Sequence, residues 1–106
     1  MLKSEAGRRF EWDEKKKREN LRKHGVLFET ATLVFEDPDA ITRRDDAFED
    51  EERWITLGAI GATLVLVVVH TYRGADNEEV IRIISARLAS PRERRKYEEA
   101  HEGAET

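Results

Sequence analysis

The sequence predicts a single α+β domain in which a small antiparallel sheet is flanked by helices. Four strand-like segments follow one another between residues 40 and 87, and short turns separate them, which favours antiparallel neighbours. One short strand and two helical segments come before them, and one helix follows, so helices must cover the sheet. The expected order is β-α-α-β-β-β-β-α. A chain of 106 residues fits one hydrophobic core, so residues 1–106 are expected to form one domain with flexible ends at 1–8 and 102–106.

The first expected strand and helix adjoin each other near the N-terminus. The segment RFEW, residues 9–12, is expected to be a short edge strand with Phe10 and Trp12 on one face. Asp13 then has the position of a helix N-cap, because its carboxylate can accept hydrogen bonds from the free N–H groups of the first turn. The helix is expected to end at Gly25, since glycine readily adopts the left-handed conformation that follows a helix.

The second expected helix is the segment VLFETATLVFEDP, which begins at residue 26. Its apolar residues recur every three or four positions, which is the helical period, and Pro38 closes it. Beyond it the expected strands are residues 40–46, 53–60, 63–72 and 80–87.

The strand at 63–72, TLVLVVVHTY, is expected to be central, because its apolar run is unbroken. Gly61 and the segment 73–79 supply the turns on either side of it. Ser90 and Pro91 take the N-cap and the first position of the last helix, which is expected to run to about His101.

The charged residues are sorted along the chain. The formal net charge is −4, which taken alone argues against a nucleic-acid partner. However, residues 13–24 carry six Lys/Arg against three acids, and residues 82–97 carry six against one. Residues 36–53 carry nine acids against three arginines. Binding of a polyanion depends on local patches, so the two basic segments keep nucleic acid open as a partner, although single charged runs are often only solvated surface.

Several classes of function are excluded by what the sequence lacks. There is no cysteine, which excludes disulfides and thiolate chemistry and suits a reducing cytoplasm. The N-terminus has no apolar segment typical of a signal peptide, and the longest apolar run is too short to span a membrane. No pair of histidines has metal-ligand spacing and no phosphate-binding motif is present, so we expect neither a metal nor a cofactor.

Arg82 and Arg87 are the first candidate site residues, because both lie inside the expected strand VIRIISAR. They are five positions apart, so in a regular strand they face opposite sides. Each can hold a phosphate through two hydrogen bonds. Each can equally form an ion pair within the protein, for example with Glu52 or Glu93.

Other candidate residues flank these elements. Glu52 and Arg53 begin a strand, where a carboxylate beside an arginine can act as a base or form a surface ion pair. His24 ends the first helix, where it either caps carbonyl groups or takes part in the site, and His70 ends the apolar strand. Tyr97 either stacks a base or packs the last helix onto the sheet. The basic residues expected to bind substrate are Lys23, Arg94 and Arg95.

Three stretches together resemble the BrnT ribonuclease toxins. They are FEWDEKKKRENLRKHGVLFETATLVFEDP, EERWITLG and RIISARLASPRERRKYE, which occur in the family's order between residues 10 and 98. The resemblance implies a compact fold similar to that of RelE-type toxins and an endoribonuclease activity that inhibits translation. It also implies a cognate antitoxin with a DNA-binding ribbon-helix-helix part, whose complex with the toxin binds operator DNA.

These observations lead to a hypothesis of metal-independent RNA cleavage through the ribose 2′-OH. Arg82, Arg87 and Arg53 are assigned to the negative charge that develops on the phosphate. Proton transfer is assigned to Glu52 or to a histidine, His24 or His70, with Tyr97 as a supporting donor or stacker. The antitoxin is expected to cover the basic surface, and the acidic segment 36–53 to meet basic antitoxin segments.

Two rival interpretations remain. One is a regulatory module that binds nucleic acid without cutting it, which predicts salt-dependent binding alone. The other is a protein-interaction domain whose cations pair with an acidic partner.

Overall fold

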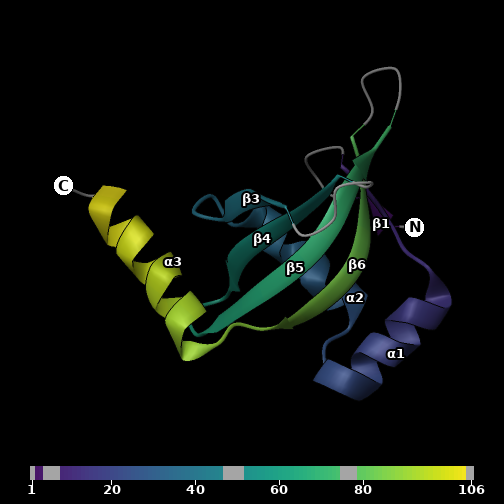
Figure 1. Ribbon diagram of the computed structural model, residues 1–106, viewed down its shortest axis with the longest axis horizontal. Coiled ribbons are helices and arrows are strands. Elements are labelled where there is room, and N and C mark those ends of the chain that lie inside the picture. Colours follow the sequence, from purple (N-terminus) through teal and green to yellow (C-terminus); the bar gives the residue numbers. More distant parts are fainter. Residues whose placement is uncertain (1, 4–7, 47–51, 75–78, 105–106) are drawn as a thin grey trace.

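The computed structural model describes residues 2–3, 8–46, 52–74 and 79–104, and it confirms the α+β class (Figure 1). A twisted six-stranded sheet runs through the molecule and helices lie against it. In chain order the elements are β1 Leu2–Lys3, β2 Arg9–Glu11, α1 Glu14–His24, α2 Phe28–Ala31, the 3₁₀ helix η1 Thr32–Glu36, β3 Ile41–Asp45, β4 Arg53–Ile60, β5 Leu64–Arg73, β6 Val80–Leu88 and α3 Pro91–Ala104.

The strands lie in the order β1-β2-β6-β5-β4-β3. β3 to β6 form the expected antiparallel meander. β2 differs, because it pairs with β6 in parallel, and β1 pairs on its outer side, so the RFEW segment is not at the edge. This parallel contact joins segments about 70 residues apart, and the helices and β3 to β5 lie between them in the chain.

α1 forms as the sequence predicts. The Asp13 carboxylate accepts hydrogen bonds from the backbone N–H groups of Lys15 and Lys16, at 2.8 and 3.2 Å. Gly25 follows the helix with φ of 71°, and its N–H donates to the carbonyl of Leu21. Both orphaned ends of the helix therefore have partners.

The second expected helix is divided into two short pieces, α2 and η1. The hydroxyl of Thr32 donates to the carbonyl of Glu29 at 2.7 Å, within the turn where the helix tightens. η1 then lies very close to β4, because a Cβ atom at Gly58 would be only 2.9 Å from that of Val34. The helical period is correct for Phe28 and Ala31, which are buried, but in the tighter 3₁₀ turn Val34 is buried and Leu33 is exposed.

α1, α2 and η1 cover one face of the sheet, and the core lies between them and the strands. Asn20 joins α1 to β6 at the point where β2 no longer covers that strand. Its amide accepts from the Ala86 N–H at 3.0 Å and donates to the carbonyls of Ala86 and Val26 at 2.8 and 2.9 Å. Asn20 thus gives the backbone N–H and carbonyl of Ala86 the hydrogen-bond partners that a neighbouring strand would give them. The buried core residues are Phe10, Val26, Phe28, Ala31, Val34, Leu66, Val68, Ile81, Ile83 and Ala86.

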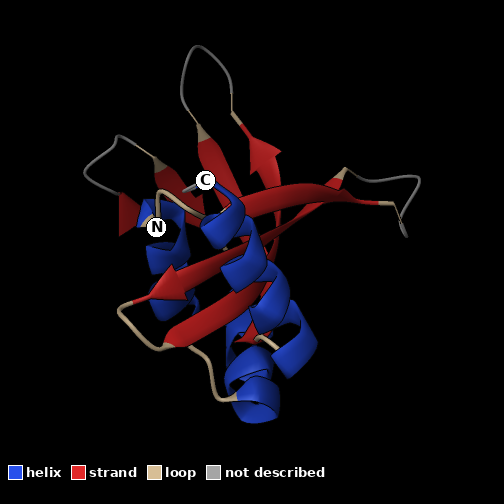
Figure 2. Ribbon diagram, turned by 90° about the vertical axis from the view of Figure 1, so that its left-hand side faces the viewer, coloured by secondary structure: helices blue, strands red, loops and turns tan. Residues whose placement is uncertain are grey.

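α3 lies against the opposite face of the sheet. Figure 2, which looks from the side of this helix, shows it in front of the strands. It begins with a capping box, because the Glu93 N–H donates to the Ser90 hydroxyl at 3.2 Å and the Ser90 N–H donates to the Glu93 carboxylate at 2.8 Å. The helix start that Ser90 and Pro91 predicted is therefore confirmed.

Some expected segments fall outside the described residues. These are residues 1 and 4–7 of the N-terminal segment, residues 47–51 of the acidic segment, residues 75–78 of the turn after β5, and residues 105–106. In the part of the chain that is described, no helix has the length and apolar character needed to cross a membrane.

Candidate functional site

The face of the sheet opposite α1 carries arginines from four strands, β3 to β6, and we call it the arginine face. Residues that pair across neighbouring strands share a face, so the register places side chains in rows. One row joins Ile41, Leu57, Val67 and Arg87 from β3 to β6. The next row, two residues along the strands, joins Arg43, Ile55, Val69 and Ser85. The third row holds Asp45, Arg53, Thr71, Arg82 and Glu11.

Arg82 and Arg87 lie on the same face, so the expectation that they face opposite sides is wrong. Arg82 pairs with Thr71 and Arg87 with Val67, and these two positions of β5 differ by an even number. The cause is a β-bulge, since the register shifts between Val69 and His70. One extra residue in β6 reverses the alternation of its side chains.

Arg53 and Arg82 occupy the third row together. Trp54 pairs with His70, so Arg53 lies level with Thr71, the cross-strand partner of Arg82. Two strand spacings separate the two arginines, which places their Cα atoms about 10 Å apart. Arg82 lies 3.4 Å from the carboxylate of Glu11, which also pairs with Arg73 at 3.1 Å. The guanidinium groups of Arg53, Arg73 and Arg82 therefore lie around one end of the arginine face.

Glu52 precedes this row immediately. It is an exposed residue next to the first residue of β4. Its position in the chain, one residue before Arg53, leaves its part in a site a prediction.

Arg87 is held by Glu93 of α3. Its Nη1 and Nη2 atoms donate to the two carboxylate oxygens at 2.7 and 2.8 Å. These hydrogen bonds, together with the backbone N–H of Ser90, lower the pKa of Glu93 to about 2, and the same pair raises the pKa of Arg87. The ion pair with Glu93 that the sequence left as an alternative is thus present, and it fixes the guanidinium at the edge of the arginine face.

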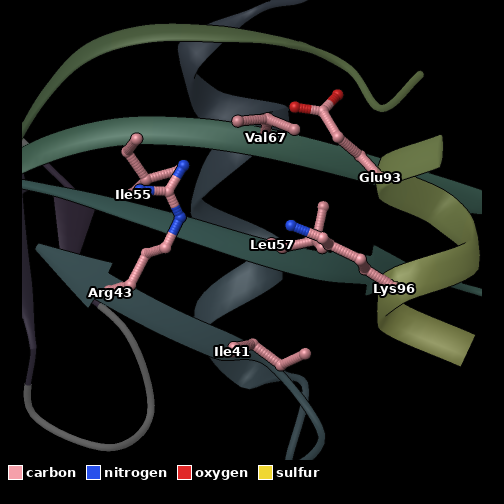
Figure 3. Close-up of a pocket in the computed structure, with 7 residues that line it drawn as sticks. All are labelled: Ile41, Arg43, Ile55, Leu57, Val67, Glu93 and Lys96. Atoms are coloured by element: carbon pink, nitrogen blue, oxygen red, sulfur yellow. The ribbon is translucent and has the colours of Figure 1, made fainter. Parts of the chain in front are cut away.

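A pocket of about 170 Å³ opens between α3 and the arginine face (Figure 3). Its floor is the apolar part of the first row together with Ile55. Figure 3 shows Arg43 extending from β3 over Ile55, while Glu93 and Lys96 extend from α3 toward the strands. Sequence reasoning missed Arg43 and Lys96 as site residues. The strand period was the available signal for Arg43, because it is two positions from Ile41.

Lys23 and His24 lie at a different place, on α1. They line a second, more open pocket of about 200 Å³ along the edge of β6, together with Lys16, Glu19, Asn20, Ile84 and Ser85. Both residues are exposed. The pocket lies along the strand that carries Arg82 and Arg87, but neither arginine lines it.

His70 lies in the core, away from the arginine face. Its side chain is fully buried, and its Nε2 atom is 2.7 Å from the hydroxyl of Thr56. Its ring packs edge-on against Phe35 and Tyr72. Burial lowers the pKa of His70 to about 4, which keeps the imidazole neutral. This residue stands on the far side of the sheet from the arginines and has no path to a ligand bound there.

Tyr97 ties α3 to the end of η1. Its hydroxyl donates to the Asp37 carboxylate at 2.5 Å, and the same carboxylate oxygen accepts from the Ala59 N–H at 2.8 Å. Burial and this hydrogen bond raise the pKa of Tyr97 well above its ordinary value, so the phenol stays protonated. The packing alternative predicted from the sequence is therefore realised in the structure.

Arg94 and Arg95 lie on the outer part of α3. Arg94 donates to Glu98 one turn later, at 3.2 Å, and Arg95 is exposed. Neither residue lines the pocket between α3 and the sheet. Among the described residues, no three His, Asp or Glu side chains form a group that could hold a metal ion.

Comparison with known proteins places the chain in a family. A family model described as the ribonuclease toxin BrnT of type II toxin–antitoxin systems matches residues 12–93. Among solved structures, the chain is similar to the ribonuclease toxin BrnT of Brucella abortus, with 28% sequence identity and a TM-score of 0.55. That similarity covers 78% of this chain and 97% of the other. No curated protein matches the chain. The match over 12–93 covers more than half of the sequence, so the chain belongs to the BrnT family of ribonuclease toxins of type II toxin–antitoxin systems.

Proposed function

We propose that the arginine face binds the RNA backbone and that cleavage proceeds without a metal ion, through the ribose 2′-OH. The observation that carries this proposal is the third row, where Arg53 and Arg82 lie level across three strands. Arg87 lies on the same face, two rows away. Guanidinium groups at fixed positions on a sheet are suited to the charge of a phosphate, because they need little reorganisation as that charge grows.

In this mechanism the 2′-oxygen forms a bond to the neighbouring phosphorus, and the bond from phosphorus to the 5′-oxygen breaks. One product ends in a 2′,3′-cyclic phosphate and the other begins with a 5′-hydroxyl. A base takes the proton of the 2′-OH, and an acid returns one to the leaving oxygen. Glu52, beside Arg53, and His24, at the edge of β6, are the proposed proton carriers. His70 is left out because it is buried on the other face.

Tyr97 and Arg87 are proposed to act mainly by position. The Tyr97 hydroxyl is hydrogen-bonded to the Asp37 carboxylate, and the Arg87 guanidinium is hydrogen-bonded to the Glu93 carboxylate. Both contacts hold α3 beside the arginine face. Lys23, Arg94 and Arg95 are proposed to contact phosphates farther along the RNA, since they are exposed or partly exposed on α1 and α3.

The test is incubation of the purified chain with single-stranded RNA in EDTA. We expect cleavage, with cyclic phosphate at the new 3′ end. A matched oligonucleotide with a single 2′-deoxyribose at the cleaved position should stay intact, because it lacks the nucleophile. Cleavage of the deoxy substrate, or activity that returns only on adding a divalent cation, would contradict the mechanism. Intact RNA with salt-dependent binding would favour the regulatory-module interpretation.

We also propose that the chain inhibits translation in the cytoplasm until its antitoxin covers the arginine face. A cationic face offers acidic antitoxin side chains a complementary surface. The antitoxin is proposed to carry a ribbon-helix-helix part, through which the complex binds operator DNA, while its basic segments meet the acidic segment 36–53. Reversing charges at Asp45 and Asp46 should then weaken antitoxin binding, and unchanged affinity would exclude that segment as a contact.

A further inference from the structure

We propose that the pocket between α3 and the arginine face holds one unpaired base of the RNA, with the phosphates on either side of that base at the cationic rim. This inference rests on the proposed function, because it assigns a base-binding subsite to the same face. The register places the pocket on the arginine face, since Ile41 pairs with Leu57 and Leu57 pairs with Val67. A base and its adjoining phosphates are a short distance apart in RNA, as are the floor and the rim of this pocket.

The floor of the pocket is suited to a flat apolar surface. Ile41, Leu57 and Val67 form one row across three neighbouring strands, and Ile55 adds a side chain from the next row. Such a row is a nearly continuous apolar strip about 10 Å wide. The volume of about 170 Å³ admits a single ring system and leaves no room for a base pair.

The rim of the pocket is cationic. Arg43 and Lys96 stand on opposite sides of it, on β3 and α3 (Figure 3). Neither forms an ion pair with another residue in the part of the chain that is described. The acid of the rim, Glu93, is engaged by Arg87. The rim therefore offers positive charge to the phosphates on either side of an inserted base.

A nucleotide satisfies both parts of this pocket. The flat face of a base can be buried against an aliphatic floor through the hydrophobic effect, while the attached phosphates need cations nearby. An aliphatic antitoxin side chain would fill the floor equally well, but it would not use Arg43 and Lys96. The charge of the rim is what favours RNA as the occupant.

The first test uses methyl groups of the wild-type chain as reporters. The ligands are single-stranded oligonucleotides of five nucleotides with 2′-O-methyl riboses, which can bind but cannot be cut. Four of them, made only of A, only of C, only of G or only of U, are titrated against protein with labelled methyl groups. We expect at least one of them to shift the methyl signals of Ile41, Leu57 and Val67. The same backbone without bases should leave those signals in place. If all four bind, as judged by amide shifts in β6, and none moves these methyls, the inference is overturned.

The second test uses paired variants and cleavage of a short RNA. Ile41→Trp fills the pocket, and Arg43→Ala and Lys96→Ala remove the rim; each should lower kcat/KM about tenfold or more, which is the usual effect of losing one stacked base or one phosphate contact. Arg44→Ala and Arg92→Ala are the matched controls. Arg44 pairs with Trp54 and so lies on the other face of β3, and Arg92 is exposed on α3 outside the pocket. Equal losses in control and rim variants would show a general charge effect and contradict the subsite.

The two tests separate this inference from the proposed function. Methyl shifts without cleavage by the wild type would keep the subsite and reject the ribonuclease mechanism. Cleavage without methyl shifts would do the reverse. Should Ile41→Trp leave RNA cleavage intact and weaken only antitoxin binding, the pocket belongs to the antitoxin and the inference is wrong.

Discussion

The guanidinium of Arg87 donates two hydrogen bonds to the carboxylate of Glu93, and this contact joins the last strand to the helix that follows it. Glu93 also accepts from the Ser90 N–H. One carboxylate thus caps α3 and positions an arginine of the arginine face.

Glu93→Gln should therefore destabilise the fold in a pH-dependent way. The pKa of Glu93 is about 2 in the folded chain, below its ordinary value of 4.5. Its contribution is fully present above about pH 4.5 and is lost as the pH falls toward 2. Because the pair is partly exposed, we expect about 1 kcal/mol at pH 7. Denaturant unfolding at pH 7 and pH 3 measures it, with Glu98→Gln as the control. A variant as stable as wild type at pH 7 would contradict the assignment.

Asn20 is expected to be the most sensitive polar position of α1. Asn20→Ala removes three hydrogen bonds and leaves the N–H and carbonyl of Ala86 buried without partners. The cost should be about 3 kcal/mol, with a fall of more than about 10 °C in Tm. Glu19→Ala, at the exposed neighbouring position, should change Tm very little. Thermal unfolding followed by circular dichroism measures both Tm values. Equal Tm values for the two variants would refute the role of Asn20 as a hydrogen-bond partner of β6.

His70 should make the fold sensitive to mild acid. Its pKa is about 4 when folded and 6.5 when free, so the unfolded chain binds the proton more readily. Stability is then full above about pH 6.5 and declines down to about pH 4, with a loss of about 2 kcal/mol at pH 5.

The measurement compares unfolding free energies at pH 7.5 and pH 5 for wild type and two variants. His70→Gln should have a smaller pH dependence than wild type, whereas His24→Gln, at an exposed site, should keep it. An NMR titration in which His70 gains its proton near pH 6.5 would refute the burial argument.

Tyr97 and Asp37 should act together. If Tyr97 serves by anchoring α3, Tyr97→Phe and Asp37→Ala lower both stability and RNA cleavage, since the first removes the donor and the second the acceptor of the hydrogen bond between them. The expected loss of stability for Tyr97→Phe is about 1 kcal/mol. The double variant should then cost little more than Asp37→Ala alone. A loss of kcat confined to Tyr97→Phe would instead make Tyr97 a group that contacts RNA.

Local signals predicted much of this fold. The N-cap at Asp13, the left-handed Gly25 and the start of α3 at Ser90 all follow from contacts within a few residues, and all three are as expected. The unbroken apolar run at 63–72 also identified β5 as a central strand. What depends on distant segments was missed, as the parallel pairing of β2 with β6 illustrates.

The site was harder to predict for a related reason. A single β-bulge in β6, opposite Val69 and His70, places Arg82 and Arg87 on the same face. The period of a regular strand instead predicts that they lie on opposite faces. The pocket residues Arg43 and Lys96 come from segments more than 50 positions apart, so only the folded chain brings them together. His70 was a candidate because imidazole can transfer protons, but its side chain is buried in the core on the other face of the sheet.

The central claim is that the arginine face is the surface on which RNA is cut. The most direct measurement is kcat/KM for a short single-stranded RNA in EDTA with Arg53→Ala and Arg82→Ala, beside Arg44→Ala. All three changes remove one positive charge, and Arg44 lies on the opposite face of the sheet. We expect losses of about a hundredfold or more for Arg53→Ala and Arg82→Ala and close to wild-type activity for Arg44→Ala. Full activity in both Arg53→Ala and Arg82→Ala, with folding intact, would contradict it.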